Sequence, residues 1–407
     1  MKSHRKLALI ALGLMMAVTQ GCSEKVKNKY NIEPMALTDP VDKISAANNK
    51  TAFKMLDATL NANKGQNVVI SPLSLSTVLA MTQNGAAGAT REEMLKALEM
   101  TGLNEKDINE QYKKIIANFN SIEALKIKMS NSIWIQKGFD VKETFINTGK
   151  DYYEAEISNV DFSKEKAADT INIWISDHTA GKIKKITDKF DSNTAMVLVN
   201  TVYFKGDWLS PFESTSTQKK MFTSSDGSQK DVDMMQDSMT VDFFKENNFE
   251  AIRLPYKDQD FGMYVLLPDK GTDVKALIGE LSSDNWNRWK AGLSEEQVFI
   301  GIPKLHIEFE QKLNDMLKSF GMKAAFNDGA DFSGINPEDL YISLVKQKCY
   351  IDVDEKGTEA AAATVVSVDT TAAIVNPREF IADRPFVFIM EDRKTGLISF
   401  MGIVEKP

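Results

Sequence analysis

The stretch that indicates the fold of this chain lies near its C-terminus, at residues 354–377, and reads DEKGTEAAAATVVSVDTTAAIVNP. Its four consecutive alanines favour helix, whereas the β-branched valines and threonines after them favour strand. A linker of small residues and an ordinary helix are therefore the plainest interpretations of this stretch when it is taken alone.

A period of two separates the side chains of this stretch into two classes. The even positions are all uncharged and either small or β-branched: Thr358, Ala360, Ala362, Thr364, Val366, Val368 and Thr370. The odd positions carry Glu359, Ser367 and Asp369, and helical spacing gives no comparable separation. The pattern predicts that the stretch can form a strand with one buried face, whose small side chains would fit a confined slot.

Residues suited to catalysis or metal binding are scarce. The only histidines are His4, His178 and His306, and there is no G-x-S-x-G, C-x-x-C or H-E-x-x-H motif. The glycine-rich segment 84–90 lacks the G-K-[ST] ending of a phosphate-binding loop. We therefore expect no enzyme activity, no metal site and no cofactor.

The first 21 residues have the features of a signal peptide. Lys2, Arg5 and Lys6 precede an apolar stretch at 7–18, which is too short to span a bilayer as a helix. Gly21 and Cys22 then resemble the end of a bacterial lipoprotein signal. We expect lipidation at Cys22, a polar tether over 22–40, and a location at the bacterial envelope or cell surface. Because Thr19 stands where leucine is usual, a secreted or periplasmic protein is the alternative.

The composition limits the partners and the covalent links of the chain. It has 407 residues and a formal net charge of −8, so it has no electrostatic reason to bind nucleic acid, and contact with a membrane is expected only through the lipid anchor. The only cysteines are Cys22 and Cys349, and lipidation of the first would leave no intramolecular disulfide. We expect Cys349 to be a buried apolar residue of a strand.

Hydrophobic periodicity predicts helices early in the chain and strands later. The predicted helices are 41–64, 72–84 with Ser71 as its N-cap, 91–98, 105–119, 167–175 and 311–320. The predicted strands are 67–70, 127–135, 196–204, 249–254, 261–267, 298–302, 385–390 and 397–404. This segregation favours the α+β class over a parallel α/β fold.

Motifs spread over residues 41–407 resemble those of the serpin family. They are NVVISPLS at 67–74, NSIW at 131–134, TAGKI at 179–183, LVNTVYFKGDW at 198–208, PKL at 303–305, EKGTEAAAA at 355–363 and FIADRPFVF at 380–388. The resemblance implies one serpin domain over 41–407, with about nine helices around three β-sheets. It also implies an exposed reactive-centre loop at about 357–377.

Membership of this family implies the activity of a suicide substrate. A target protease would cleave the loop and become covalently attached as an acyl-enzyme, and the loop would then insert as a strand into the main sheet. The expected function is irreversible inhibition of serine proteases by a monomer, with cysteine proteases as a further class of target. The alternative is a non-inhibitory serpin that acts as a binding module.

The resemblance also assigns roles to individual residues. The hinge of the loop would be Glu355, Gly357, Thr358, Ala360, Ala361, Ala362 and Ala363. Lys304 would pair with Glu355 at the top of the sheet, the breach, with Trp208 beside the pair. Ser71, Ser74 and Asn200 would form the polar cluster called the shutter. Gln347 stands where the family usually has a histidine, and its amide can both donate and accept hydrogen bonds.

Two counts place the scissile bond differently. Counting forward from Gly357 gives Thr371-Ala372, which we prefer, whereas counting back from 382–385 gives Ile374-Val375. The loop has no Lys or Arg at 357–377, which argues against trypsin-like targets. Its small and aliphatic residues favour elastase-like or subtilisin-like proteases, and Asp369 leaves an Asp-specific protease as a minor alternative.

Overall fold

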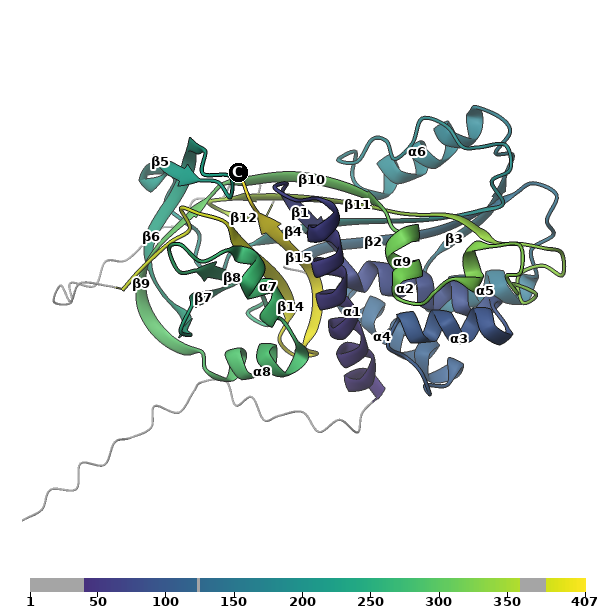
Figure 1. The fold of residues 1–407 in the computed structure, drawn as a ribbon, viewed down its shortest axis with the longest axis horizontal. Helices are drawn as coiled ribbons and strands as arrows, with labels where there is room; N and C mark the ends of the chain where they lie inside the picture. Colours follow the sequence, from purple (N-terminus) through teal and green to yellow (C-terminus); the bar gives the residue numbers. More distant parts are fainter. Residues whose placement is uncertain (1–39, 123–124, 359–377) are drawn as a thin grey trace, which may run out of the picture. The chain divides into compact units, whose positions relative to one another are not determined.

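The computed structural model describes residues 40–122, 125–358 and 378–407, which fold into helices packed on two β-sheets (Figure 1). These residues confirm the α+β class and contain nine α-helices. The helices are α1 Pro40–Ala62, α2 Pro72–Thr82, α3 Gly88–Ala97, α4 Glu105–Ser121, α5 Glu143–Tyr153, α6 Lys166–His178, α7 Val274–Glu280, α8 Ser283–Ala291 and α9 Asn314–Ser319. No helix in these three ranges is long and apolar enough to cross a membrane.

The larger sheet has nine strands, in the order β1-β15-β14-β8-β7-β6-β9-β13, with β5 paired to β6. Its strands are β1 Val68–Ile70, β5 Gln218–Thr223, β6 Gln229–Lys245, β7 Phe249–Pro255, β8 Phe261–Pro268, β9 Ser294–Pro303, β13 Arg378–Ile381, β14 Phe386–Asp392 and β15 Leu397–Val404. Strands β8, β14 and β15 are buried along their whole length, as their nearly continuous apolar sequences indicate.

The smaller sheet has six strands in the order β10-β11-β12-β4-β2-β3. Its strands are β2 Leu125–Gln136, β3 Glu156–Val160, β4 Met196–Asp207, β10 Leu305–Lys312, β11 Ile342–Asp354 and β12 Gly357–Thr358. Helix α6 lies over one face of this sheet, and α2 lies under the other (Figure 1).

The strands of the described residues form two hydrogen-bonded sheets, although the family resemblance implied three. The reason is the length of β6, which has 17 residues. Its first residues, 229–234, pair with β5, residues 234–243 pair with β9, and residues 242–245 pair with β7, so the ladder runs without interruption through both regions. The sequence did not indicate this strand. Its buried and exposed residues alternate over only part of its length, so its side chains show no continuous period of two.

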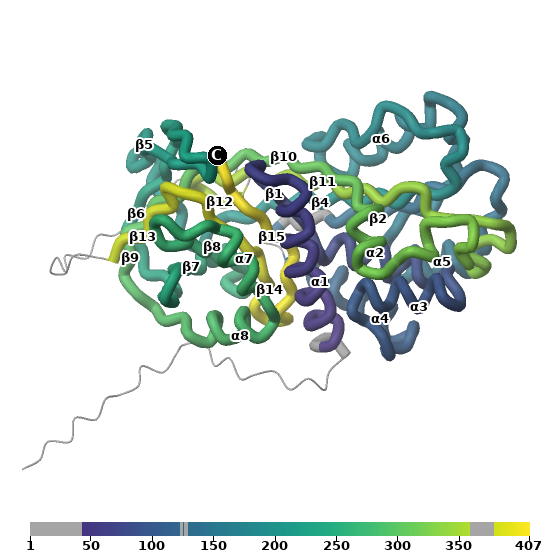
Figure 2. The backbone as a smooth tube through the Cα atoms, in the orientation of Figure 1, coloured from purple at the N-terminus to yellow at the C-terminus, as the bar shows by residue number. Residues whose placement is uncertain are grey.

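The main hydrophobic core lies between the two sheets and the helices α1 and α2. Every residue of α2 is buried, as expected for a helix that is surrounded by other elements on all sides. Helix α1 and strand β15 come from opposite ends of the chain, yet they lie side by side (Figure 2). A second, smaller cluster fills the space between α6 and the outer face of the six-stranded sheet.

One predicted helix began too early in the chain. We expected a helix at 311–320, but Gln311 and Lys312 are the last residues of β10, and α9 covers only Asn314–Ser319. The alternating burial of 305–312 accounts for the difference, since apolar residues point inward at every second position and the pairing with β11 continues to Lys312.

Candidate functional site

A slot between two strands of the six-stranded sheet is the feature on which the sequence predictions converge. Strands β11 and β4 pair directly and in parallel from Ile342 to Tyr350. Beyond this point β12 lies between them and pairs antiparallel with both. Thr358 lies opposite Val353 on one side and Gly206 on the other. The first residues of the candidate loop therefore already occupy the upper end of the seam between β11 and β4.

Gly357 is required at this position by the close approach of β4. A Cβ atom on Gly357 would lie 2.1 Å from the carbonyl oxygen of Gly206 and 2.7 Å from the Cα of Asp207. Both atoms belong to the backbone, so neither can move aside as a flexible side chain would. Only glycine lets β12 enter the seam at this depth.

Thr358 is completely buried, and its hydroxyl is hydrogen-bonded to the hydroxyl of Tyr256, at 2.8 Å. The Tyr256 ring stacks on Trp208, with 4.5 Å between ring centroids. Burial raises the pKa of Tyr256 far above its ordinary value, despite the opposing hydrogen bond with Thr358. The phenol is therefore neutral at physiological pH and can serve as either donor or acceptor to the loop.

An ion pair stands at the entrance to the seam. Lys304 Nζ lies 2.8 Å from Glu355 Oε1, which also accepts a hydrogen bond from the Thr217 hydroxyl at 2.7 Å. Burial alone would raise the pKa of Glu355, but the hydrogen bonds from Lys304 and Thr217 outweigh it and hold this pKa below its ordinary value. The carboxylate is therefore charged at neutral pH and the ion pair is intact.

Trp208 connects the end of β4 to the turn that follows β11. Its indole Nε1–H donates to the carbonyl of Asp354 at 3.1 Å, and its backbone N–H donates to the carbonyl of Lys356 at 2.8 Å. The ring is buried. These bonds fix the backbone on either side of Glu355, which orients the carboxylate toward Lys304.

Farther down the seam, neighbouring strands place buried amides side by side on the core face of the sheet. Gln347 of β11 lies opposite Asn200 of β4, which in turn lies opposite Asn131 of β2. Gln347 Nε2 donates to Asn200 Oδ1 at 2.9 Å, and Asn200 Nδ2 donates to Asn131 Oδ1 at 2.7 Å. These three residues, the amide rung, join both sides of the seam.

The N-terminus of α2 binds both halves of the amide rung. The Ser71 N–H donates to Gln347 Oε1 at 3.1 Å, and Gln347 Nε2 donates to the Ser71 carbonyl at 2.8 Å. Asn200 Nδ2 donates to the Ser74 hydroxyl. Ser71 is the N-cap residue, as predicted, but its hydroxyl does not cap the helix. It donates instead to the carbonyl of Ser399 in β15, at 2.7 Å.

Comparison with known proteins identifies the family. A family model described as "Serpin (serine protease inhibitor)" matches residues 46–407. This chain belongs to the serpin family. A serpin-like protein of Methanosarcina acetivorans is 33% identical over 98% of this chain and 95% of its own length. The leukocyte elastase inhibitor of Bos taurus is 33% identical over 90% of this chain and 100% of its own length.

The fold of this serpin matches those of solved family members. The crystal structure of the thermophilic serpin tengpin in its native state superposes with a TM-score of 0.83 and 30% identity, covering 90% of this chain and 94% of tengpin. Serpins are generally protease inhibitors, not catalytic enzymes. The family assignment thus agrees with the scarcity of catalytic residues in the sequence.

The serpin's structure places some of the predicted site residues and leaves others undescribed. Glu355, Lys304 and Trp208 come together at the top of the seam, and Ser71, Ser74, Asn200 and Gln347 come together lower down. Outside the described residues lie Cys22, the signal peptide, the predicted tether except its last residue, Pro40, which begins α1, the hinge alanines Ala360, Ala361, Ala362 and Ala363, and both candidate bonds, Thr371-Ala372 and Ile374-Val375. Cys349 is buried, as predicted.

Sequence reasoning missed three residues of the site. Asn131 was quoted only as part of the NSIW motif, although a buried asparagine in an apolar strand is a usable signal. Tyr256 and Thr217 lie outside every quoted motif, and no local pattern marks them. Their side chains reach the seam only because β7 and the segment before β5 pack against its upper end.

Proposed function

We propose that this serpin is an irreversible suicide-substrate inhibitor of serine proteases, with elastase-like and subtilisin-like enzymes as preferred targets and cysteine proteases as a second class. The monomeric inhibitor offers the loop at 357–377, is cleaved at Thr371-Ala372 or at Ile374-Val375, and forms a covalent complex. Insertion of the cleaved loop into the six-stranded sheet then traps the acyl-enzyme.

The observation that carries this proposal is the position of β12. Gly357 and Thr358 already lie between β11 and β4 and run antiparallel to both. Continued insertion would need no reversal of direction, since the residues after Thr358 would extend the same strand toward the amide rung. One parallel pair would become two antiparallel pairs, which are slightly more stable per residue.

The register of β12 also predicts which side chains would face the core. If it continues unchanged, every even residue of the loop faces core positions such as Ile351 and Cys349 of β11. Thr364 would then lie between Gln347 and Asn200, where its hydroxyl can bond the amides. The uncharged face noted in the sequence is thus the face that the slot would bury. Thr364, which carries a hydroxyl on this face, would lie at the depth of the amide rung.

The driving force for this reaction is the set of strand contacts that the intact loop leaves unmade. About 14 residues from 358 to 371, at roughly 3.3 Å each, would span on the order of 45 Å when extended. This length supports displacement of an attached protease over a large distance. Cleavage releases the loop from its second anchor at β13, which is what keeps the strand from entering.

Incubation with an elastase tests the proposal. We expect an SDS-stable complex whose mass is the sum of the protease and the serpin without the fragment that follows the cleaved bond. Mass spectrometry of that fragment would distinguish the two candidate bonds. Complete cleavage of the loop by every elastase-like and subtilisin-like protease tried, with no complex formed, would contradict inhibition.

The non-inhibitory alternative makes a different prediction for the cleaved protein. An inserting loop should raise the melting temperature sharply after cleavage by a protease that is not trapped, because a new central strand is added. A binding module without insertion should show no such gain. The small residues of the hinge favour the inhibitory function, since none of them is too bulky for the slot.

We also propose that a lipid on Cys22 anchors the serpin at the bacterial envelope. We expect the full chain to fractionate with membranes and the Cys22→Ser variant to be released into the soluble fraction. Retention of Cys22→Ser with the membranes would contradict a lipid anchor at this residue and favour another mode of attachment.

A further inference from the structure

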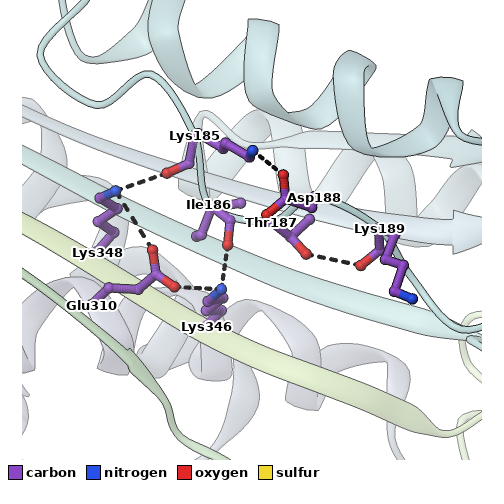
Figure 3. Close-up of a pocket in the computed structure, with 8 residues that line it drawn as sticks. All are labelled: Lys185, Ile186, Thr187, Asp188, Lys189, Glu310, Lys346 and Lys348. Carbon is purple, nitrogen blue, oxygen red and sulfur yellow. Dashed lines mark hydrogen bonds and ion pairs between the residues drawn. The ribbon is translucent and has the colours of Figure 1, made fainter.

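A cavity of about 410 Å³ lies on the outer face of the six-stranded sheet, between residues 185–189 and the strands β10 and β11 (Figure 3). We call it the lysine pocket. Its volume is within the range of sites that bind small ligands. The charged residues that line it are Lys185, Asp188, Lys189, Glu310, Lys346 and Lys348. Lysines thus outnumber carboxylates here by four to two, although the whole chain has a formal net charge of −8.

Two of these lysines are held in fixed positions, with Glu310 between their side chains (Figure 3). Lys346 Nζ lies 2.5 Å from Glu310 Oε1 and donates to the Ile186 carbonyl. Lys348 Nζ lies 3.5 Å from Glu310 Oε2 and donates to the Lys185 carbonyl at 2.8 Å. The two lysine side chains are only 17% and 10% exposed. A ligand that binds them therefore avoids the cost of ordering two mobile side chains, which binding to surface lysines usually carries.

The lysine pocket retains both a hydrogen-bond donor and a positive charge for a ligand. An ammonium carries three N–H donors, and Lys346 uses two of them on the acceptors named above. The exposed Lys189 has no carboxylate partner in the part of the chain that the structure describes. When Glu308, which pairs with Lys348 from outside the cavity, is counted, one positive charge remains in excess. The pocket is therefore suited to an anion.

We propose that the lysine pocket is a binding site for a small phosphate monoester. A ligand with a single carboxylate would offer Lys346 no more than Glu310 already provides. A phosphate monoester carries nearly two negative charges at neutral pH and three acceptor oxygens, and lysine binds phosphate as a point charge. One such ligand can accept from Lys346 and face Lys189 at the same time. The inference does not depend on the inhibitory function.

Isothermal titration calorimetry with glycerol 3-phosphate at low ionic strength tests the site. For the parent protein we expect a dissociation constant on the order of 1 mM, as suits a few charge-assisted contacts with partly exposed groups. D-Glycerate is the matched ligand, because it has a similar size but only one charge, and it should bind at least about tenfold more weakly. Added salt should weaken the binding of both ligands, since their charges remain partly exposed.

Three variants locate the site on the protein. We expect Lys189→Ala to weaken binding of glycerol 3-phosphate about fivefold, through the loss of one charge. Lys346→Met should weaken it about tenfold, because a charged hydrogen bond is lost as well. Lys220→Ala is the matched control, since Lys220 of β5 is also exposed and has no carboxylate partner among the described residues; it should bind as the parent does. Urea unfolding checks each fold, and the exposed Lys189 keeps the test valid if Lys346→Met does not fold.

A second ligand identifies the source of the phosphate. Dihexanoyl phosphatidic acid carries the same phosphate ester as glycerol 3-phosphate and adds two short acyl chains. Tighter binding of this lipid would identify a membrane headgroup as the ligand, and equal binding would identify a free phosphate ester.

Three results would overturn the site. No heat of binding with glycerol 3-phosphate would show that the pocket holds no phosphate ester. D-Glycerate binding as tightly as glycerol 3-phosphate would show that the second charge is not recognised. An equal loss of affinity in Lys189→Ala and Lys220→Ala would show that the anion responds to the charge of the whole protein and not to this pocket.

Discussion

Replacement of Thr358 by arginine is expected to turn the serpin from an inhibitor into a substrate. The Thr358 side chain is completely buried between β11 and β4 and bonded to Tyr256. Burying a guanidinium there would cost several kcal/mol, so we expect the intact variant to keep β12 out of the seam, and the charge would be buried only when the cleaved loop inserts. A cost of about 3 kcal/mol slows insertion more than a hundredfold, so the acyl-enzyme would hydrolyse before it is trapped.

The measurement is the ratio of covalent complex to cleaved serpin after reaction with an elastase. For Thr358→Arg we expect cleavage at the rate of the parent protein and almost no complex. Thr358→Ser is the matched control, since it keeps the hydroxyl that meets Tyr256 and adds no volume, and it should retain most of the complex. An arginine variant that traps the protease as well as the parent would rule out entry of this residue into the slot.

Changes at Gln347 are expected to have the second large effect, on stability and its dependence on pH. Gln347→Met removes the partner of the Ser71 N–H, the Ser71 carbonyl and Asn200 Oδ1, all of which are buried. Leaving such groups unpaired costs about 1–3 kcal/mol each where water cannot replace the partner. We therefore expect a loss of at least about 2 kcal/mol in the free energy of unfolding at every pH.

Gln347→His should add a pH dependence that the parent protein lacks at this position. Burial lowers the pKa of a histidine, so the unfolded chain would bind a proton more readily than the folded one. The stability of the variant relative to the parent should be constant above about pH 7. It should then fall as the pH drops below about 6.5, by up to roughly 1.4 kcal/mol per pH unit.

Urea unfolding of both variants and the parent protein between pH 8 and pH 5 measures this effect. The difference between Gln347→His and the parent isolates the new histidine from every other titrating group. Gln347→Met is the control, because it has no group that titrates in this range. A difference that does not vary with pH would mean that water reaches the amide rung, so that the histidine is not desolvated there.

Local patterns predicted the elements that are buried on all sides or amphipathic. Helix α2 begins at Pro72 after the N-cap Ser71, as expected from proline's fixed φ and its missing N–H. Strand β4 was indicated by its continuous apolar run. The short strand at Gly357–Thr358 is the described part of the alternating stretch that was predicted to be able to form a strand.

The predictions failed where pairing across the fold outweighs local preference. Residues 311 and 312 extend a strand because β11 lies beside them, although their sequence favours helix. Strand β6 is long because it has partners along its whole length, and its own residues alternate too weakly to show it. Strand pairing decided both cases: β10 with β11, and β6 with its chain neighbours β5 and β7 and with the more distant β9.

The contrast is clearest in the stretch at 354–377. Its alternation of uncharged and charged side chains is a property of the chain alone, since side-chain direction in a strand has a period of two. That β11 and β4 leave room at their upper ends for two of its residues follows only from how β4 pairs with β11 and β12, which lie far from it in sequence. Side-chain pattern therefore specified which face of the loop can be buried, and long-range pairing created the slot that would bury it.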